Sequence, residues 1–183
     1  MPQIHIRRFL PMDLPALAMI DHNSTTEFVW QMDIQQGEDE ITVGFRERRL
    51  PRVVRQIYPR DHGKLAENWQ DRWGILVGVV GEENDRNPTG YIAMAQGHAP
   101  DVARITDLAV ATPVRRQGMA SALVLSAEDW AVSQRCARLL MEVQSKNFPA
   151  IRMAQKLGYE FCGYNDRYFP NKDIALFFDK SLL

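Results

Sequence analysis

Strict alternation of apolar and polar residues marks two segments in the first third of the chain. Apolar side chains occupy every second position over residues 28–34 and again over 41–45, and the polar residues 36–39 separate the two runs. Side chains of a strand point alternately to its two faces, so this pattern predicts a β-hairpin rather than a helix. We place the hairpin at residues 27–49, as an insertion ahead of the central sheet.

The remaining pattern changes repeatedly between strand-like and helix-like segments. A first strand is predicted around Ile4 and Ile6, and helical spacing of apolar residues predicts a short helix over 13–21. The charged stretch 51–70 is expected to form a short helix and an exposed loop. Further strands are predicted at 73–80, 90–96, 105–110, 139–143, 159–164 and 174–179, and further helices at 114–132 and 150–157. This order predicts one α/β domain over residues 1–183.

Composition excludes several function classes without selecting one. Acidic and basic residues number 23 and 22, so no net field attracts nucleic acid or a membrane surface. The N-terminus lacks an apolar core of signal-peptide length, and no apolar run is long enough to cross a bilayer. Cys136 and Cys162 are expected to be free thiols, with Cys162 buried on a strand, and the four histidines lack metal-ligand spacing. The expectation is a cytoplasmic protein without a metal.

The most informative segment joins a predicted strand to a long helix. After the strand 105–110 the chain breaks at Pro113 and passes the residues 115–120 (Arg-Arg-Gln-Gly-Met-Ala) before the helix. A turn of small residues at a helix N-terminus presents free backbone N–H groups and the positive end of the helix dipole, which suits a pyrophosphate. Small residues also suit a tight turn that binds nothing, but the adjacent arginines favour phosphate binding.

Two motifs and the order of elements resemble the GNAT acetyltransferase superfamily. The first motif is Arg115-Arg-Gln-Gly118-Met-Ala120, which is similar to the superfamily signature of Arg or Gln, two residues, Gly, one residue, and Gly or Ala. The second is Met141-Glu-Val-Gln-Ser-Lys-Asn147, followed by Lys-Leu-Gly-Tyr at 156–159. The resemblance spans residues 3–182 and is nearest to streptothricin acetyltransferase-type members. It implies an α/β (α+β) GNAT fold, with a mixed twisted sheet of six to seven strands flanked by helices and an added N-terminal hairpin.

The same resemblance implies acetyl-CoA as co-substrate, held by a core at residues 103–159. Backbone N–H groups around Met119 would bind the pyrophosphate, assisted by Arg115 and Arg116, and the strand end 108–110 would pair with the pantetheine arm as an added strand does. A backbone N–H near Ala109 or Val110 would stabilise the oxyanion of the tetrahedral intermediate. The residues expected to contact the coenzyme are Leu108, Ala109, Val110, Arg115, Arg116, Gln117, Gly118, Met119, Ala120, Ser121, Asn147, Ala150 and Met153.

Acetyl transfer to an amine needs a base more than an acid. A lysine-like amine with a pKa near 10.4 costs about 4.6 kcal/mol to deprotonate at pH 7, against about 2 kcal/mol to protonate a thiolate. Glu142 matches a glutamate that is catalytic in some members, and it is the leading candidate for the base, acting directly or through a water. Asp107 is the second candidate. The competing interpretations are structural, with Glu142 bonded to a neighbouring strand or loop and Asp107 paired with an arginine such as Arg104.

The proton donor to the departing thiolate is harder to assign. Many members of the superfamily carry a tyrosine for this role at the position that Ala154 occupies in this chain. A water, Tyr164 or Tyr168 is the alternative source, although aromatic residues on closing strands usually pack in the core.

Together these features predict transfer of an acetyl group from acetyl-CoA to a primary amine, on a small molecule such as an antibiotic or a lysine-like amine, or on a peptide. The alternative is a catalytically weak acyl-CoA-binding sensor or interaction module with the same fold, which Ala154 favours and Glu142 disfavours. An arginine-rich stretch at 46–60 either attracts an acidic group or forms a solvated face, the commoner case. No nucleic-acid or membrane partner is expected, and a homodimer is left open.

Overall fold

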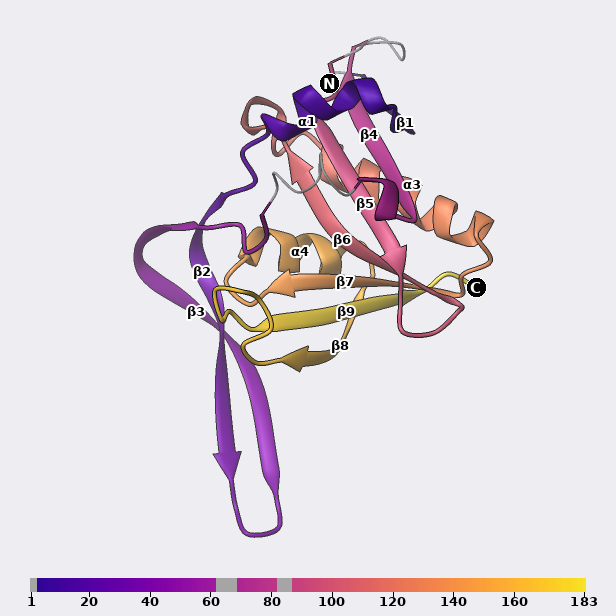
Figure 1. The fold of residues 1–183 in the computed structure, drawn as a ribbon. Helices are drawn as coiled ribbons and strands as arrows, with labels where there is room; N and C mark the ends of the chain where they lie inside the picture. The colour runs from indigo at the N-terminus through magenta and orange to yellow at the C-terminus, as the bar shows by residue number, and fades with distance from the viewer. Residues whose placement is uncertain (1–2, 62–68, 82–86) are drawn as a thin grey trace.

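The computed structural model describes residues 3–61, 69–81 and 87–183, which form two β-sheets and three α-helices. The larger sheet has the strand order β1-β4-β5-β6-β7-β9-β8, and β2 and β3 form a separate hairpin (Figure 1). The strands of the larger sheet are β1 (Ile4–Arg8), β4 (Gly74–Val80), β5 (Gly90–Gln96), β6 (Val102–Val110), β7 (Arg138–Gln144), β8 (Glu160–Asn165) and β9 (Ala175–Ser181). Among the strand pairs of the described residues, only β6 and β7 run parallel. The predicted mixed sheet of six to seven strands is confirmed.

Helices cover both faces of this sheet. On one face, α3 (Met119–Ser133) and α4 (Phe148–Lys156) bury Leu123, Ala127 and Ile151 in the main apolar cluster. On the other face, α1 (Leu14–Ala18) packs Leu17 into a second cluster with residues of β4 and β5. These two clusters hold the central strands rigidly, so side chains at the ends of those strands are fixed in place.

The two parallel strands diverge halfway along their length. β6 pairs with β7 only from Val102 to Ile105, whereas its pairing with β5 continues to Val110. Beyond Ile105 the edge of β6 that faces β7 therefore has no strand partner, and the two strands separate (Figure 1). We call this opening the fork.

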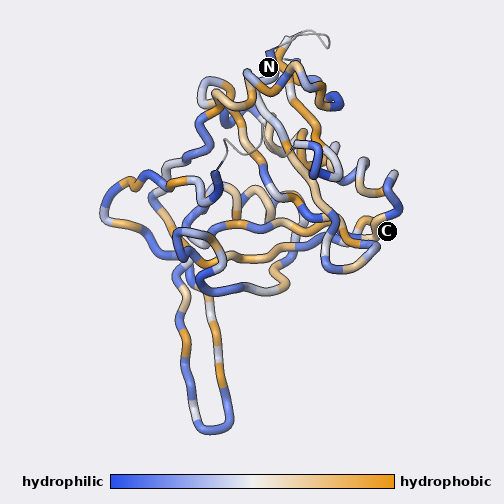
Figure 2. Tube along the Cα trace, in the orientation of Figure 1, coloured by the Kyte–Doolittle hydropathy of each residue, from blue (hydrophilic) through white to orange (hydrophobic). Residues whose placement is uncertain are grey.

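The hairpin extends away from the rest of the molecule, and we call it the arm (residues 24–56, comprising β2, Ser24–Gln36, and β3, Ile41–Gln56; Figure 1). It is attached at its base, where the Trp30 N–H donates to the Ser145 carbonyl (2.8 Å) and the Trp30 ring packs edge-on against Phe178. Hydrophobic and hydrophilic residues alternate along the arm, and its tip is hydrophilic (Figure 2). The predicted hairpin is confirmed, and both strands are longer than expected.

Several boundaries differ from the sequence-based expectations. Residues 51–56 of the stretch predicted as helix and loop belong to β3, because the ladder with β2 continues to Ser24 opposite Gln56; residues 62–68 of that stretch lie outside the described part. The helix predicted over 114–132 begins only at Met119, because Arg116 and Gly118 have positive φ angles, which a helix excludes. The helix predicted over 13–21 is short, and a 3₁₀ turn at Pro11–Asp13 precedes it.

The cysteines are free thiols, but the expectation of a buried Cys162 is wrong. Cys136 is buried, whereas Cys162 is exposed. Cys162 lies on β8, which is the edge strand of the large sheet. It also lines an open pocket.

None of the helices among the described residues is long and apolar enough to cross a membrane. Residues 3–61, 69–81 and 87–183 also contain no group of His, Cys, Asp and Glu side chains that could hold a metal ion.

Candidate active site

The start of α3 forms an open anion-binding turn. Gly118 has φ +94° and ψ −7°, and it precedes Met119, the first residue of the helix; a left-handed residue followed by a helical one directs successive N–H groups into one concavity. The first helical bond runs from the Ala122 N–H to the Gly118 carbonyl (2.9 Å), and no side chain caps this end. The N–H groups of Met119, Ala120 and Ser121 therefore have no partner in the helix ladder. The position that a Cβ on Gly118 would take has no heavy atom within 4 Å, so the space in front of these groups is open.

Arg115 joins the turn to two other segments through bonds to backbone carbonyls. Its Nε donates to the Val110 carbonyl (2.8 Å), its Nη1 to the Asn23 carbonyl (2.8 Å), and its Nη2 to the Asp21 carbonyl. These bonds tie the end of β6 to the segment that leads into the arm. Arg116 is exposed.

A pocket of about 90 Å³ lies in the fork and gathers residues from four parts of the chain. It brings together the predicted residues Asp107, Leu108, Glu142, Asn147, Ala150 and Met153. It also includes Tyr58, Pro59 and Arg60, which follow the arm and were not predicted as site residues. Asn147 additionally caps α4, because its side chain accepts a bond from the Ala150 N–H (3.3 Å).

Asp107 lies in the fork, and one of its two carboxylate oxygens accepts no hydrogen bond from the described residues. The Tyr58 hydroxyl donates to Oδ1, and Arg72 Nη1 lies 3.0 Å from Oδ2. Despite this ion-pair distance, Oδ2 is buried and accepts no hydrogen bond from the described residues. The expected arginine partner is thus present, but it is Arg72 rather than Arg104. A carboxylate oxygen that accepts no hydrogen bond can accept one from a bound ligand.

Tyr58 is the phenol closest to this carboxylate. Burial, and secondly the negative charge of Asp107, raise the pKa of Tyr58 well above 10, so the hydroxyl is protonated at neutral pH. The chain positions it through the Tyr58 N–H, which donates to the Asn23 side chain (2.8 Å), and through the His22 ring, whose centre is 4.9 Å from that of Tyr58.

Glu142 stands on the other side of the fork with both oxygens engaged. Arg60 Nη2 lies 2.5 Å from Oε2 and Arg104 Nη1 lies 2.6 Å from Oε1, and the Glu142 side chain is only 2% exposed. Arg60 also donates to the Thr106 carbonyl on β6 (2.5 Å), so its guanidinium bridges the two diverging strands. Both Glu142 oxygens already accept hydrogen bonds from guanidinium groups, and this geometry favours an electrostatic role for Glu142.

The two tyrosines predicted as proton donors lie in different surroundings. Tyr168 lines a larger, open pocket of about 630 Å³ that shares Glu142 and borders the fork, and burial together with Glu142 raises the pKa of Tyr168. Tyr164 lies on β8 with its ring centre 5.3 Å from that of Phe45 in the arm. Ala154 is fully buried in the main apolar cluster, so α4 offers no hydroxyl there. The tyrosine nearest Asp107 is therefore Tyr58.

The chain is similar to known acetyltransferases. The model of the acetyltransferase (GNAT) family matches residues 42–159. A streptothricin acetyltransferase from Streptomyces lavendulae is 27% identical over 164 residues, which cover 87% of this chain and 82% of that protein. The solved structure of nourseothricin acetyltransferase has a TM-score of 0.78 at 21% identity and covers 98% of this chain and 99% of its own. A Bacillus anthracis str. Ames protein solved in complex with acetyl coenzyme A has a TM-score of 0.75 at 16% identity, with 98% and 99% covered. More than half of the chain matches the family model, and the chain belongs to the acetyltransferase (GNAT) family.

Proposed function

We propose that this protein transfers the acetyl group of acetyl-CoA to a primary amine on a small molecule. One observation carries the proposal. The last residues of β6 connect the fork, which holds Asp107, directly to the open turn at the start of α3. A pyrophosphate at the turn and a thioester at the fork would be the two ends of one extended ligand. The relative from Streptomyces lavendulae acts, by its name, on streptothricin, which supports a small-molecule acceptor.

The coenzyme would bind along the free edge of β6. The open space before Met119 and Ala120 suits the pyrophosphate, and the stretch from Leu108 to Val110, which β7 does not pair with, suits an extended pantetheine arm. A backbone N–H of this stretch would then stabilise the oxyanion as the amine attacks.

The proton would pass from the amine to the thiol through two side chains. Asp107 Oδ2 would accept one proton from the attacking ammonium, while the Tyr58 hydroxyl would give its proton to the departing sulfur; Asp107 would then return a proton to Tyr58 across their hydrogen bond. The second proton that the nitrogen loses as it becomes an amide would leave to the solvent. One C–S bond breaks and one C–N bond forms, and the enzyme ends in its starting protonation state. In this assignment the ion pairs of Glu142 with Arg60 and Arg104 hold the two strands of the fork in place and determine the charge in the pocket.

Release of free coenzyme A thiol tests the activity. We expect thiol release from acetyl-CoA with streptothricin or another small primary amine, at a higher rate than with peptides that carry a free N-terminus. The matched control is the same acceptor with its amines already acetylated, which should give only background release. Binding of acetyl-CoA without thiol release for any amine would instead support an acyl-CoA-binding module.

A further inference from the structure

The outer half of the arm, residues 31–46, carries an apolar face without a cover in the described part of the chain. In the β2–β3 ladder Ile34 lies opposite Val43, and Ile41 follows on the same face because side chains alternate along a strand. Ile34 is 54% exposed and Ile41 is 66% exposed. A hairpin of two strands is marginally stable by itself in water, so an extended arm with an exposed apolar face indicates a surface that becomes covered.

This apolar face continues onto the body of the molecule. Phe45 of the arm packs against Phe161 and Tyr164 of β8, with ring centres 5.7 and 5.3 Å apart. Phe161 remains 46% exposed and Tyr164 37% exposed. Exposed apolar side chains therefore lie both on the outer half of the arm and on the edge strand β8, and Phe45 lies in contact with that strand.

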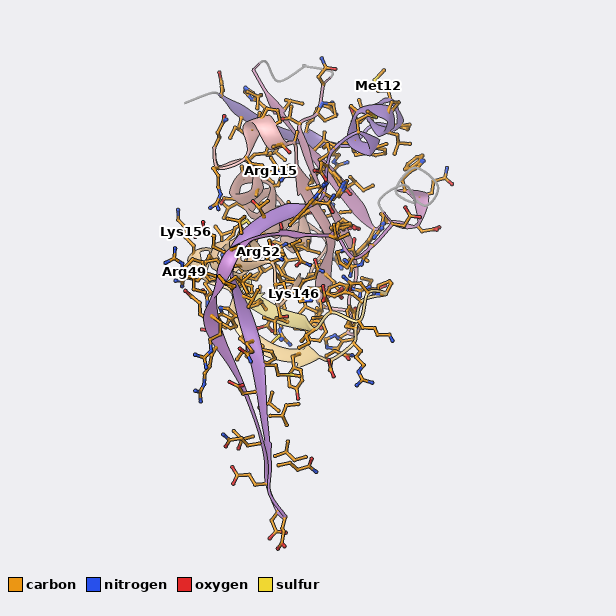
Figure 3. The ribbon with its side chains drawn as sticks, turned by 90° about the vertical axis from the view of Figure 1, so that its left-hand side faces the viewer. Met12, Arg49, Arg52, Arg115, Lys146 and Lys156 are labelled. Atoms are coloured by element: carbon orange, nitrogen blue, oxygen red, sulfur yellow. The ribbon has the colours of Figure 1, made fainter. Side chains whose placement is uncertain are left out.

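Charges are ordered along the arm. The tip is acidic, with Glu38, Asp39 and Glu40, and the part of β3 nearer the body is basic, with Arg46, Arg48, Arg49 and Arg52. Figure 3 shows Arg49 and Arg52 where the arm joins the body. Within the described ranges, Asp39, Arg48 and Arg52 form no ion pair. From its tip to the body of the molecule, the arm therefore carries an acidic segment, an apolar segment and a basic segment.

We propose that the arm binds the arm of a second copy of this chain, with the two arms antiparallel. The acidic–apolar–basic order is complementary to itself when reversed, which is what a two-fold symmetric interface requires. Arg48 lies nine positions after Asp39, a span of about 30 Å in extended chain, so a two-fold axis near Val43 places each tip beside the basic segment of the other arm. The apolar face of each arm, with Ile34 and Ile41, then lies beside the exposed Phe161 and Tyr164 of the other copy. The outer edge of β3 has unpaired backbone groups that suit this side-by-side contact.

The mass of the full chain in solution tests this interface. At tens of micromolar we expect a particle of about 42 kDa, twice the 21.0 kDa of one chain. The double substitution Ile34→Glu with Ile41→Glu should give the monomer mass with an unchanged circular dichroism spectrum, because both side chains are exposed. The control Val132→Glu, at a comparably exposed position on α3 (49%), should remain a dimer. A monomeric wild-type protein, or a dimer that survives the arm substitutions, would overturn the proposal.

Charge exchange tests the tip-to-base arrangement itself. One variant reverses the charge of the acidic tip (Glu38→Lys, Asp39→Lys, Glu40→Lys), and the other reverses the charge of the basic segment (Arg48→Glu, Arg52→Glu). Each variant should be monomeric alone, because like charges would meet at both ends of the interface. When the two variants are mixed in equal amounts they should form a heterodimer, since the tip of each variant then meets a segment of opposite charge on the other. A mixture that stays monomeric would contradict the antiparallel arrangement.

Discussion

Replacing Gly118 with Trp is expected to weaken acetyl-CoA binding by at least about 100-fold, or roughly 2.8 kcal/mol. Gly118 faces open space ahead of α3, and an indole there would occupy the position proposed for the pyrophosphate, against the N–H groups of Met119 and Ala120. The Gly118 Cβ would meet no heavy atom within 4 Å, so the fold should accommodate the new side chain. Calorimetric titration with acetyl-CoA measures the change.

The control for this substitution is Gly118→Ala. The φ of +94° at Gly118 costs any L-residue about 1–2 kcal/mol, so Ala and Trp should lower the free energy of unfolding by similar amounts. Ala leaves the space nearly open and should retain most of the affinity. Equal affinities of the two variants would place the phosphates elsewhere.

The second large effect is expected for Asp107→Asn. A positioned base contributes about 10²–10⁴-fold, so kcat/KM should fall by at least about 100-fold at pH 7. An acceptor amine with a pKa near 10.4 gains about 100-fold in its free-base fraction between pH 7 and pH 9. The variant should therefore recover activity across this range far more than the wild type, because the amine no longer needs a base.

The substitution Glu142→Gln distinguishes the role of the Glu142 carboxylate from that of the Asp107 carboxylate. Because Arg60 and Arg104 occupy both Glu142 oxygens, its loss should disturb the fork and lower activity by a similar factor at pH 7 and pH 9. If Glu142→Gln shows the recovery at high pH and Asp107→Asn does not, Glu142 is the base.

The parts of the site that follow from local sequence were predictable. The turn at 115–120 is defined by neighbouring residues and by the helix that follows it, and the alternation over 28–45 defines the arm through the two-residue period of a strand. The sequence motifs also indicated Asp107, Glu142 and Asn147 as site residues, and the structure places all three in the lining of one pocket.

The partners of these residues could not be predicted, because they come from distant segments without periodicity. Tyr58 and Arg60 lie in a charged stretch for which a short helix and an exposed loop were expected, yet they reach Asp107 and Glu142 across 49 and 82 positions of the chain. The bonds from Arg115 to the carbonyls of residues 21, 23 and 110 were likewise not indicated by its motif. Such contacts depend on the packing of the whole fold, which no local pattern contains.

The position of the coenzyme tests the central claim most directly, through a crystal structure of this chain with acetyl-CoA. We predict the pyrophosphate against the backbone N–H groups that follow Gly118, the pantetheine along Leu108–Val110, and the thioester in the fork beside Tyr58 and Asp107. A coenzyme bound away from the start of α3, or with its thioester outside the fork, would contradict the account.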